Sequence, residues 1–300
     1  MPASPRSTKE RAKSSGSSSA GRWSRGDVQA GAGTVARTAW RRRMKILVCI
    51  KQVPDLESRF KIAASGTWYA AEDLAWRLNE YDEYAVEEAV RLREASGEGE
   101  LVVLSLGPER AGEAIRKALA MGADRGVHLL DPLSHDKDPR QIAGAIAEYA
   151  RGEKFDVIFT GLQSQDRGSA QVGLLLAGLL ALPAVTTIVA FSHEAGLVTV
   201  RRELEGGARA VVKVRLPALF TCQLGLNTPR YPTLPNIMKA KKKEVRTIAV
   251  TDLPQVAALV RTEKLAFPDK RGAGVVLEGA TSEVADRLIA ILKEKTTVLK

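Results

Sequence analysis

Hydrophobic positions along the chain alternate between short β-branched runs and longer stretches with helical spacing. The first clear run, Lys45–Val53 (KILVCIKQV), predicts a strand that is closed by the turn signal Pro54-Asp55. Apolar residues three and four positions apart then predict a helix over residues 79–95. The alternation continues with strands predicted over 100–105, 126–130 and 156–160, and helices over 110–121, 139–151 and 169–182. Gly122 and Gly152 are expected to close two of these helices.

The second half of the chain has strand-like runs with few helices between them, over 184–191, 197–204, 208–216 and 218–222. Strands that alternate with helices of about a dozen residues are typical of βαβ units, so we predict an α/β fold with a mostly parallel, Rossmann-like sheet flanked by helices. The later strands predict an antiparallel extension. Ligands of open α/β sheets bind beyond the carboxyl ends of the strands, which directs attention to residues 49–55, 105–108 and 161–173.

The segment 161–173, GLQSQDRGSAQVG, joins a predicted strand to a predicted helix. It is longer than the roughly 2–6 residues of a usual βα loop. Glycines and small polar residues would bring backbone N–H groups to the start of a helix, an arrangement that suits a phosphate. Neither GxGxxG nor GxxxxGK[ST] is present, so it is no dinucleotide fingerprint and no P-loop. The alternative is a surface loop in which Ser169 caps the helix.

A second unusual segment is 227–243, NTPRYPTLPNIMKAKKK. Pro229, Pro232 and Pro235 fix φ at every third position, which predicts a stiff, extended loop. Leu234 lies within this loop with no regular element to bury it, and a cationic helix is expected over 236–243. A stiff loop that carries an apolar residue beside a cationic helix favours a surface that binds another protein. The alternative is a proline-rich connector followed by lysines that face water.

The formal charge of +10 is concentrated at the N-terminus. Residues 1–43 contain ten Lys or Arg and two Asp or Glu, which leaves 35 basic against 33 acidic residues in the remainder. A nearly neutral folded part does not indicate nucleic-acid binding. The first 43 residues are expected to form a disordered basic extension: a transit peptide, a disposable tail, or sequence upstream of a true start at Met44.

Other chemistry is sparse. The two cysteines, Cys49 and Cys222, are expected to be core thiols, and the three histidines show no metal-ligand spacing. No apolar run is clean enough to span a bilayer. No catalytic constellation is present, and Glu87 and Glu88 are interpreted as solvent-facing partners of nearby arginines.

Several segments together resemble the beta subunits of electron transfer flavoproteins. The matching segments are KILVCIKQVPD (45–55), NEYDEYAVEEAVRL (79–92), ALAMGADRGVHL (118–129), DVIFTGLQSQDRGSAQVG (156–173) and LNTPRYPTLPNIMKAKKKEV (226–245). The resemblance implies an adenine-nucleotide-binding α/β domain over 44–235. It also implies that residues 236–300 form a C-terminal helix and an arm that embraces an alpha subunit.

The resemblance further implies a heterodimer whose FAD lies mainly on the alpha subunit, while the beta subunit binds AMP or, in electron-bifurcating members, a second FAD. Tyr81 matches a position near the flavin ring of the alpha subunit. The implied nucleotide-site residues are Cys49, Asn79, Asp82, Leu106, Gly161, Asp166, Ser169, Ala170, Gln171 and Gly173.

Leu234 matches the family's anchoring leucine for acyl-CoA and related dehydrogenases, and Lys239 and Lys242 match lysines beside it. The implied function is an electron carrier, not an enzyme by itself, which passes electrons from fatty acid oxidation to a quinone oxidoreductase. The alternatives are a bifurcating subunit that accepts hydride from NADH, and a stand-alone nucleotide-binding regulator. A bacterial cytoplasmic location is expected, with no stable membrane insertion and no nucleic acid as partner.

Overall fold

The computed structural model describes residues 43–268 and 274–297. Residues 1–39 and 40–300 are separate units of the chain, and the described residues all belong to the second. The basic extension predicted for residues 1–43 therefore lies outside the described residues, apart from Arg43. The division of the rest at residue 235 stays a prediction.

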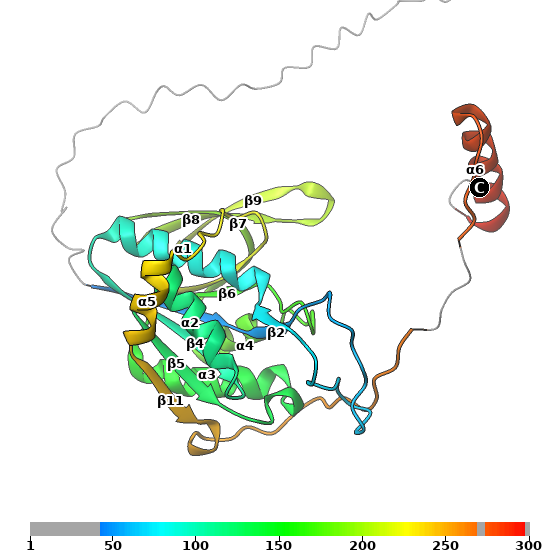
Figure 1. The fold of residues 1–300 in the computed structure, drawn as a ribbon. Helices are drawn as coiled ribbons and strands as arrows, with labels where there is room; N and C mark the ends of the chain where they lie inside the picture. Colours follow the sequence, from blue (N-terminus) through cyan, green and yellow to red (C-terminus); the bar gives the residue numbers. More distant parts are fainter. Residues whose placement is uncertain (1–42, 269–273, 298–300) are drawn as a thin grey trace, which may run out of the picture. The chain divides into compact units, whose positions relative to one another are not determined.

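The strands and helices follow one another along the chain as expected for an α/β protein (Figure 1). The strands are β1 (Met44–Ile50), β2 (Gln52–Pro54), β3 (Trp76–Leu78), β4 (Gly99–Gly107), β5 (Arg125–Leu130), β6 (Val157–Gly161), β7 (Ala184–Glu194), β8 (Leu197–Glu203), β9 (Arg209–Arg215), β10 (Ala218–Cys222) and β11 (Val245–Ala249). The helices are α1 (Glu80–Ser96), α2 (Ala111–Met121), α3 (Pro139–Glu153), α4 (Val172–Leu179), α5 (Leu234–Lys242) and α6 (Thr281–Lys295).

Nine of the strands form one sheet in the order β11-β5-β4-β1-β6-β10-β7-β8-β9. Every pairing from β11 to β7 is parallel, and the pairings β7–β8 and β8–β9 are antiparallel. The predicted fold class, including the antiparallel extension, is confirmed. Strands β2 and β3 form a separate antiparallel pair, which the sequence analysis did not predict.

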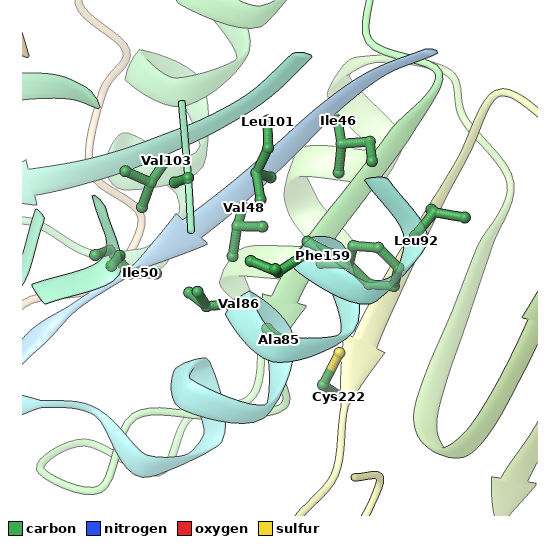
Figure 2. Packing of buried hydrophobic residues seen from close by; sticks show 14 of the residues in the cluster. Ile46, Val48, Ile50, Ala85, Val86, Leu92, Leu101, Val103, Phe159 and Cys222 are labelled. Carbon is green, nitrogen blue, oxygen red and sulfur yellow. The ribbon is translucent and has the colours of Figure 1, made fainter. Parts of the chain in front are cut away.

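The central parallel strands, β1, β4, β6 and β10, are buried on both faces, as a sheet with helices on each side requires. Successive residues of β1 point to opposite faces, so Val48 joins one hydrophobic cluster with α1 and α2, while Leu47 joins the other with α3 and α4. Figure 2 shows the first cluster, in which Ile46 and Val48 lie beside Phe159 of β6 and Val86 of α1. Cys49 and Cys222 are buried free thiols, as expected.

The structure corrects several predicted boundaries. The run 45–53 is not one strand, because it breaks at Lys51, whose N–H donates to Asp82 Oδ2 at 2.7 Å. Helix α3 continues past Gly152 and ends at Glu153, and the C-cap Lys154 takes the left-handed conformation at φ 52°. Helix α4 is shorter than the predicted 169–182, and α5 begins at Leu234 inside the predicted extended loop. Strand β11 and helix α6 were not predicted.

Residues 254–268 form an extended arm that follows the start of α3. Asp138 caps α3, because its Oδ1 accepts the N–H of Gln141 at 2.8 Å. Its other oxygen accepts the N–H groups of Leu259 and Val260 at 2.6 and 3.1 Å. Further along, the N–H of Leu265 donates to Gly66 O at 2.7 Å. The arm is therefore tied to two neighbouring parts of the domain through its backbone.

Candidate functional site

A cleft opens beyond the carboxyl ends of β1, β4 and β6, where the fold rule places a ligand. It encloses about 1160 Å³, its open mouth included. All three strand ends selected from the sequence contribute residues to its walls.

The β6–α4 loop is fixed by Asn79, the buried residue before α1. The side-chain amide of Asn79 donates to Gln163 O at 2.9 Å and its oxygen accepts the N–H of Gln165 at 3.0 Å. Further along the loop, Gly168 and Ala170 take left-handed conformations, with φ of 60° and 53°. Asn79 therefore positions the loop, since both its amide nitrogen and its amide oxygen bind the loop backbone.

Two glycines bring backbones close together at the cleft. A Cβ at Gly161 would lie 2.2 Å from Asp82 Oδ1, and a Cβ at Gly173 would lie 2.7 Å from Thr160 Oγ1. Gly173 lies in the first turn of α4, where backbone N–H groups have no partner within the helix. Its missing side chain lets that turn sit directly on the ends of β6 and β10, so the N–H groups border the cleft.

Asp82 lies beneath the loop and ties two strand ends together. Its oxygens accept the N–H groups of Lys51 and Gly161 at 2.7 and 3.1 Å. Burial raises the pKa of Asp82 to about 7, although the hydrogen bonds from Lys51, Asn79 and Gly161 act in the opposite direction. Asp82 is thus a buried structural acceptor at the floor of the cleft.

Lys51 and Asp166 form an ion pair across the cleft, with the Lys51 ammonium 2.6 Å from a carboxylate oxygen. Burial lowers the pKa of Lys51, and Asp166 opposes this effect. Because the pair is internally neutral, Asp166 serves mainly to hold Lys51 and the loop together.

All ten predicted nucleotide-site residues line the cleft; these are Cys49, Asn79, Asp82, Leu106, Gly161, Asp166, Ser169, Ala170, Gln171 and Gly173. Tyr81 does not line it, but its hydroxyl lies 3.3 Å from the Gln163 amide nitrogen beside it. Ser169 does not cap α4, because the helix begins at Val172 and its preceding residue, Gln171, makes no side-chain cap. Whether these residues contact a ligand stays a prediction.

The sequence analysis missed an aromatic wall contributed by residues 55–76. Trp68, Tyr69 and Trp76 line the cleft and form a chain of rings, with centroids 4.4 and 6.4 Å apart. Two arginines stack on this wall, Arg110 over Trp76 and Arg167 over Trp68, with guanidinium carbons 3.8 and 4.4 Å from the ring centroids. The spacing of Trp68, Tyr69 and Trp76 between two predicted elements was the available signal.

The second candidate surface is the segment 227–243. Leu234 is the first residue of α5 and is 78% exposed, while Thr233 caps the helix by accepting the N–H of Asn236 at 3.4 Å. Lys239 and Lys242 are exposed on the same helix. Arg116 of α2 donates to the carbonyl oxygens of Ala240 and Lys243, both at 2.8 Å, and so secures the end of α5.

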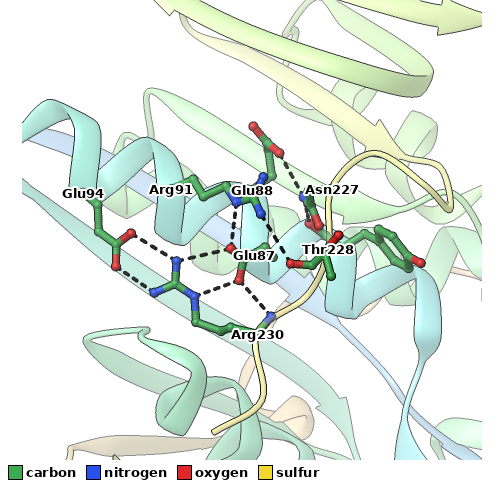
Figure 3. A network of polar contacts seen from close by, with 8 residues as sticks. Glu87, Glu88, Arg91, Glu94, Asn227, Thr228 and Arg230 are labelled. Atoms are coloured by element: carbon green, nitrogen blue, oxygen red, sulfur yellow. Dashed lines mark hydrogen bonds and ion pairs between the residues drawn. The ribbon is translucent and has the colours of Figure 1, made fainter.

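Figure 3 shows how the loop before α5 is tied to α1. The guanidinium of Arg230 lies between Glu87 and Glu94, at 2.8 and 2.7 Å. Asn227 donates to Glu88 at 2.9 Å. The expectation that Glu87 and Glu88 face solvent is wrong, since they are 2% and 8% exposed. The loop covers them, and a local reading of the helix could not include a loop about 140 residues away.

Residues 43–268 and 274–297 contain neither a candidate metal site nor a helix that could cross a membrane. No group of three or more His, Cys, Asp or Glu side chains there could hold a metal ion. The helices within these ranges are too short or too polar to cross a membrane.

Comparison with known proteins gives consistent matches. Residues 67–253 match the family model described as the electron transfer flavoprotein domain. The electron transfer flavoprotein subunit beta of Methylophilus methylotrophus is 34% identical over 261 residues, covering 84% of this chain and 98% of that protein. The mouse subunit beta is 38% identical over 254 residues, with 84% and 97% covered. That of Bacillus subtilis is 36% identical over 263 residues, with 85% and 100% covered.

Proposed function

The chain belongs to the electron transfer flavoprotein family as a beta subunit, and from this premise we propose how its two surfaces divide the work. As a beta subunit it pairs with an alpha subunit and carries electrons rather than acting as an enzyme on its own. The cleft holds an adenine nucleotide. The segment 227–243 docks the redox partners.

The nucleotide is AMP or the adenylate half of a second FAD, while the FAD that carries electrons lies mainly on the alpha subunit. Support comes from the first turn of α4, where Gly173 lets unpaired backbone N–H groups border the cleft. Such a helix start binds phosphate through its N–H groups and its dipole. Asn79 and Asp82 hold the loop that leads to this turn.

The observation that carries the docking proposal is the exposure of Leu234 at the start of a secured helix. Leu234 is 78% exposed, and Arg230 and Arg116 fix the chain on either side of it. Such a leucine is suited to enter a pocket of another protein. Lys239 and Lys242 would steer an acidic partner toward it. The proposed donors are acyl-CoA and related dehydrogenases, and the proposed acceptor is a quinone oxidoreductase.

Leu234→Ala in the purified heterodimer tests the docking proposal. We expect its rate of reduction by an acyl-CoA dehydrogenase, at subsaturating carrier, to fall roughly 30-fold, as for an interface hot spot. Nucleotide content and stability should stay unchanged. Leu204→Ala is the matched control, because Leu204 is 42% exposed between β8 and β9, outside both the cleft lining and the segment 227–243. Equal rates for the two variants would contradict the proposal. The expected cytoplasmic location stays a prediction.

A further inference from the structure

A groove separate from the cleft opens between α2 and α5, and the proposed function gives it no role. Figure 1 shows α5 packed against α2. The lining residues are Arg116, Lys117 and Ala120 of α2, together with Pro232, Ile237, Ala240 and Lys241 of the segment 227–243. The groove is therefore built half from the body of the domain and half from the segment proposed to dock redox partners.

The inner surface of the groove is apolar. Its most deeply buried residues are Ala120 and Ala240, which are 3% and 2% exposed. Because alanine has only a methyl group, these two positions leave depth between the helices. Ile237 and Pro232 add apolar wall, and Ile237 is still 39% exposed. Such a groove suits an aliphatic or aromatic side chain, whose burial would remove apolar surface from water.

The polar lining residues of the groove are all cationic. Lys117 is paired with Glu83, with the ammonium 2.5 Å from a carboxylate oxygen. Among the described residues, neither Arg116 nor Lys241 has a carboxylate within 4.0 Å, because Arg116 donates to the carbonyl oxygens of Ala240 and Lys243 instead. The groove therefore keeps a net positive charge, which complements an acidic partner surface.

The groove is continuous with the exposed leucine at the start of α5. Leu234, Ile237 and Lys241 are three and four positions apart, so they lie along one side of the helix. Ile237 follows Leu234 by roughly 4.5 Å along the helix axis. A protein that receives Leu234 in a pocket therefore extends its own surface over the groove.

We propose that the α2–α5 groove receives an apolar side chain of the redox partner, flanked by carboxylates, so that docking is reciprocal. Leu234 enters the partner, and a residue of the partner enters this chain. The inference rests on the proposed docking function and names the chemistry of the partner surface. Ile237 and Lys241 become contact residues of the interface in addition to Leu234.

The test measures reduction of the complete heterodimer by an acyl-CoA dehydrogenase at subsaturating carrier. Ile237→Trp fills the groove from its own wall and should slow reduction roughly 10-fold, although it adds apolar surface. Leu204→Trp adds the same bulk between β8 and β9 and should behave as wild type. Lys241→Glu should slow reduction roughly 5-fold at low ionic strength and recover at high ionic strength. Lys213→Glu, the same charge change on β9, should have no effect.

The outcomes separate the groove from the docking proposal on which it rests. A normal rate for Ile237→Trp beside a slow Leu234→Ala would overturn the groove and leave docking intact. A normal rate for Leu234→Ala would overturn both. The double variant should combine the two losses, and a rate equal to that of Leu234→Ala alone would refute a separate partner side chain. Should Ile237→Trp fail to assemble, Ile237→Gln, which makes the wall polar, decides in the same direction.

Discussion

Arg230→Ala removes the side chain that ties the docking segment to α1. In wild type, Glu87 is the centre of this tie, since its carboxylate receives Arg230 Nε at 2.8 Å, Arg230 Nη2 at 3.2 Å and Arg91 Nε at 2.7 Å. The Glu87 side chain is only 3% exposed. The variant therefore leaves a buried carboxylate with one arginine in place of two.

The cost follows from burial and from the partner that remains. Breaking a buried ion pair from one side costs roughly 3–5 kcal/mol. Arg91 and the backbone N–H of residue 230 continue to bind Glu87, and Arg230 itself is 35% exposed and partly screened. We therefore expect a loss of about 1.5–3 kcal/mol in the free energy of unfolding at pH 7.

The loss should depend on pH in a defined direction. Burial acts to raise the pKa of Glu87, but the hydrogen bonds from Arg230 and Arg91 outweigh it and hold the pKa below its usual range. Stability from a depressed carboxyl pKa is present above the unfolded pKa of about 4.3 and is lost as the pH falls through the folded pKa. The difference between variant and wild type should therefore shrink below pH of about 4.

Urea denaturation of the heterodimer at several pH values measures this difference. Glu94→Gln is the matched control, because it removes the exposed partner of the same arginine and should cost less than about 1 kcal/mol. Arg230→Ala should also slow electron acceptance, since Leu234 loses its fixed position. Equal stabilities of Arg230→Ala and Glu94→Gln, or a difference that grows in acid, would refute this reasoning.

Three other predictions concern the cleft and the docking surface. Gly173→Ala should lower the free energy of unfolding by about 1–3 kcal/mol and weaken nucleotide binding, because the added Cβ would collide with Thr160. Gly178→Ala should change neither quantity, because no atom lies within 4 Å of its added Cβ. Denaturation measures the stability of both variants, and calorimetry measures their nucleotide binding. Asp82 has a raised pKa of about 7, so its contribution to stability should decline as the pH rises from about 4 through 7, and Asp82→Asn should flatten that slope in urea titrations. The slower reduction of Leu234→Ala should persist at high ionic strength, where salt screens charges. Any slowing by Lys242→Ala should disappear there, because only the lysine acts through long-range attraction.

The sheet was predictable because its strands carry uninterrupted apolar runs. Val157–Gly161 and Ala218–Cys222 read as buried strands and pair in parallel with each other. Short elements were not predictable in the same way. Strand β2 spans three residues, and its boundary with β1 depends on Asp82 binding the N–H of Lys51 from another element. No local pattern contains that contact.

The candidate site was predictable where its residues follow strands. The loop 161–173 was found because strand ends of a parallel sheet meet at one edge, and the family resemblance then named Asp166 and Gly173 within it. The aromatic wall was missed because Trp68 reaches the cleft from an irregular segment with no periodicity, and Trp76 reaches it from β3, which spans only three residues. Likewise, Glu87 was placed in solvent because only tertiary folding brings Arg230 over it.

The arm along α3 is held by atoms that every amino acid possesses. Asp138 binds the amide groups of Leu259 and Val260, and Arg140 and Gln141 donate to the carbonyl oxygens of Ala257 and Val256. The side chains of Leu259 and Val260 remain 72% and 67% exposed. The side chains of Leu259 and Val260 can therefore change to suit a different neighbour, while Asp138, Arg140 and Gln141 keep the path of the arm.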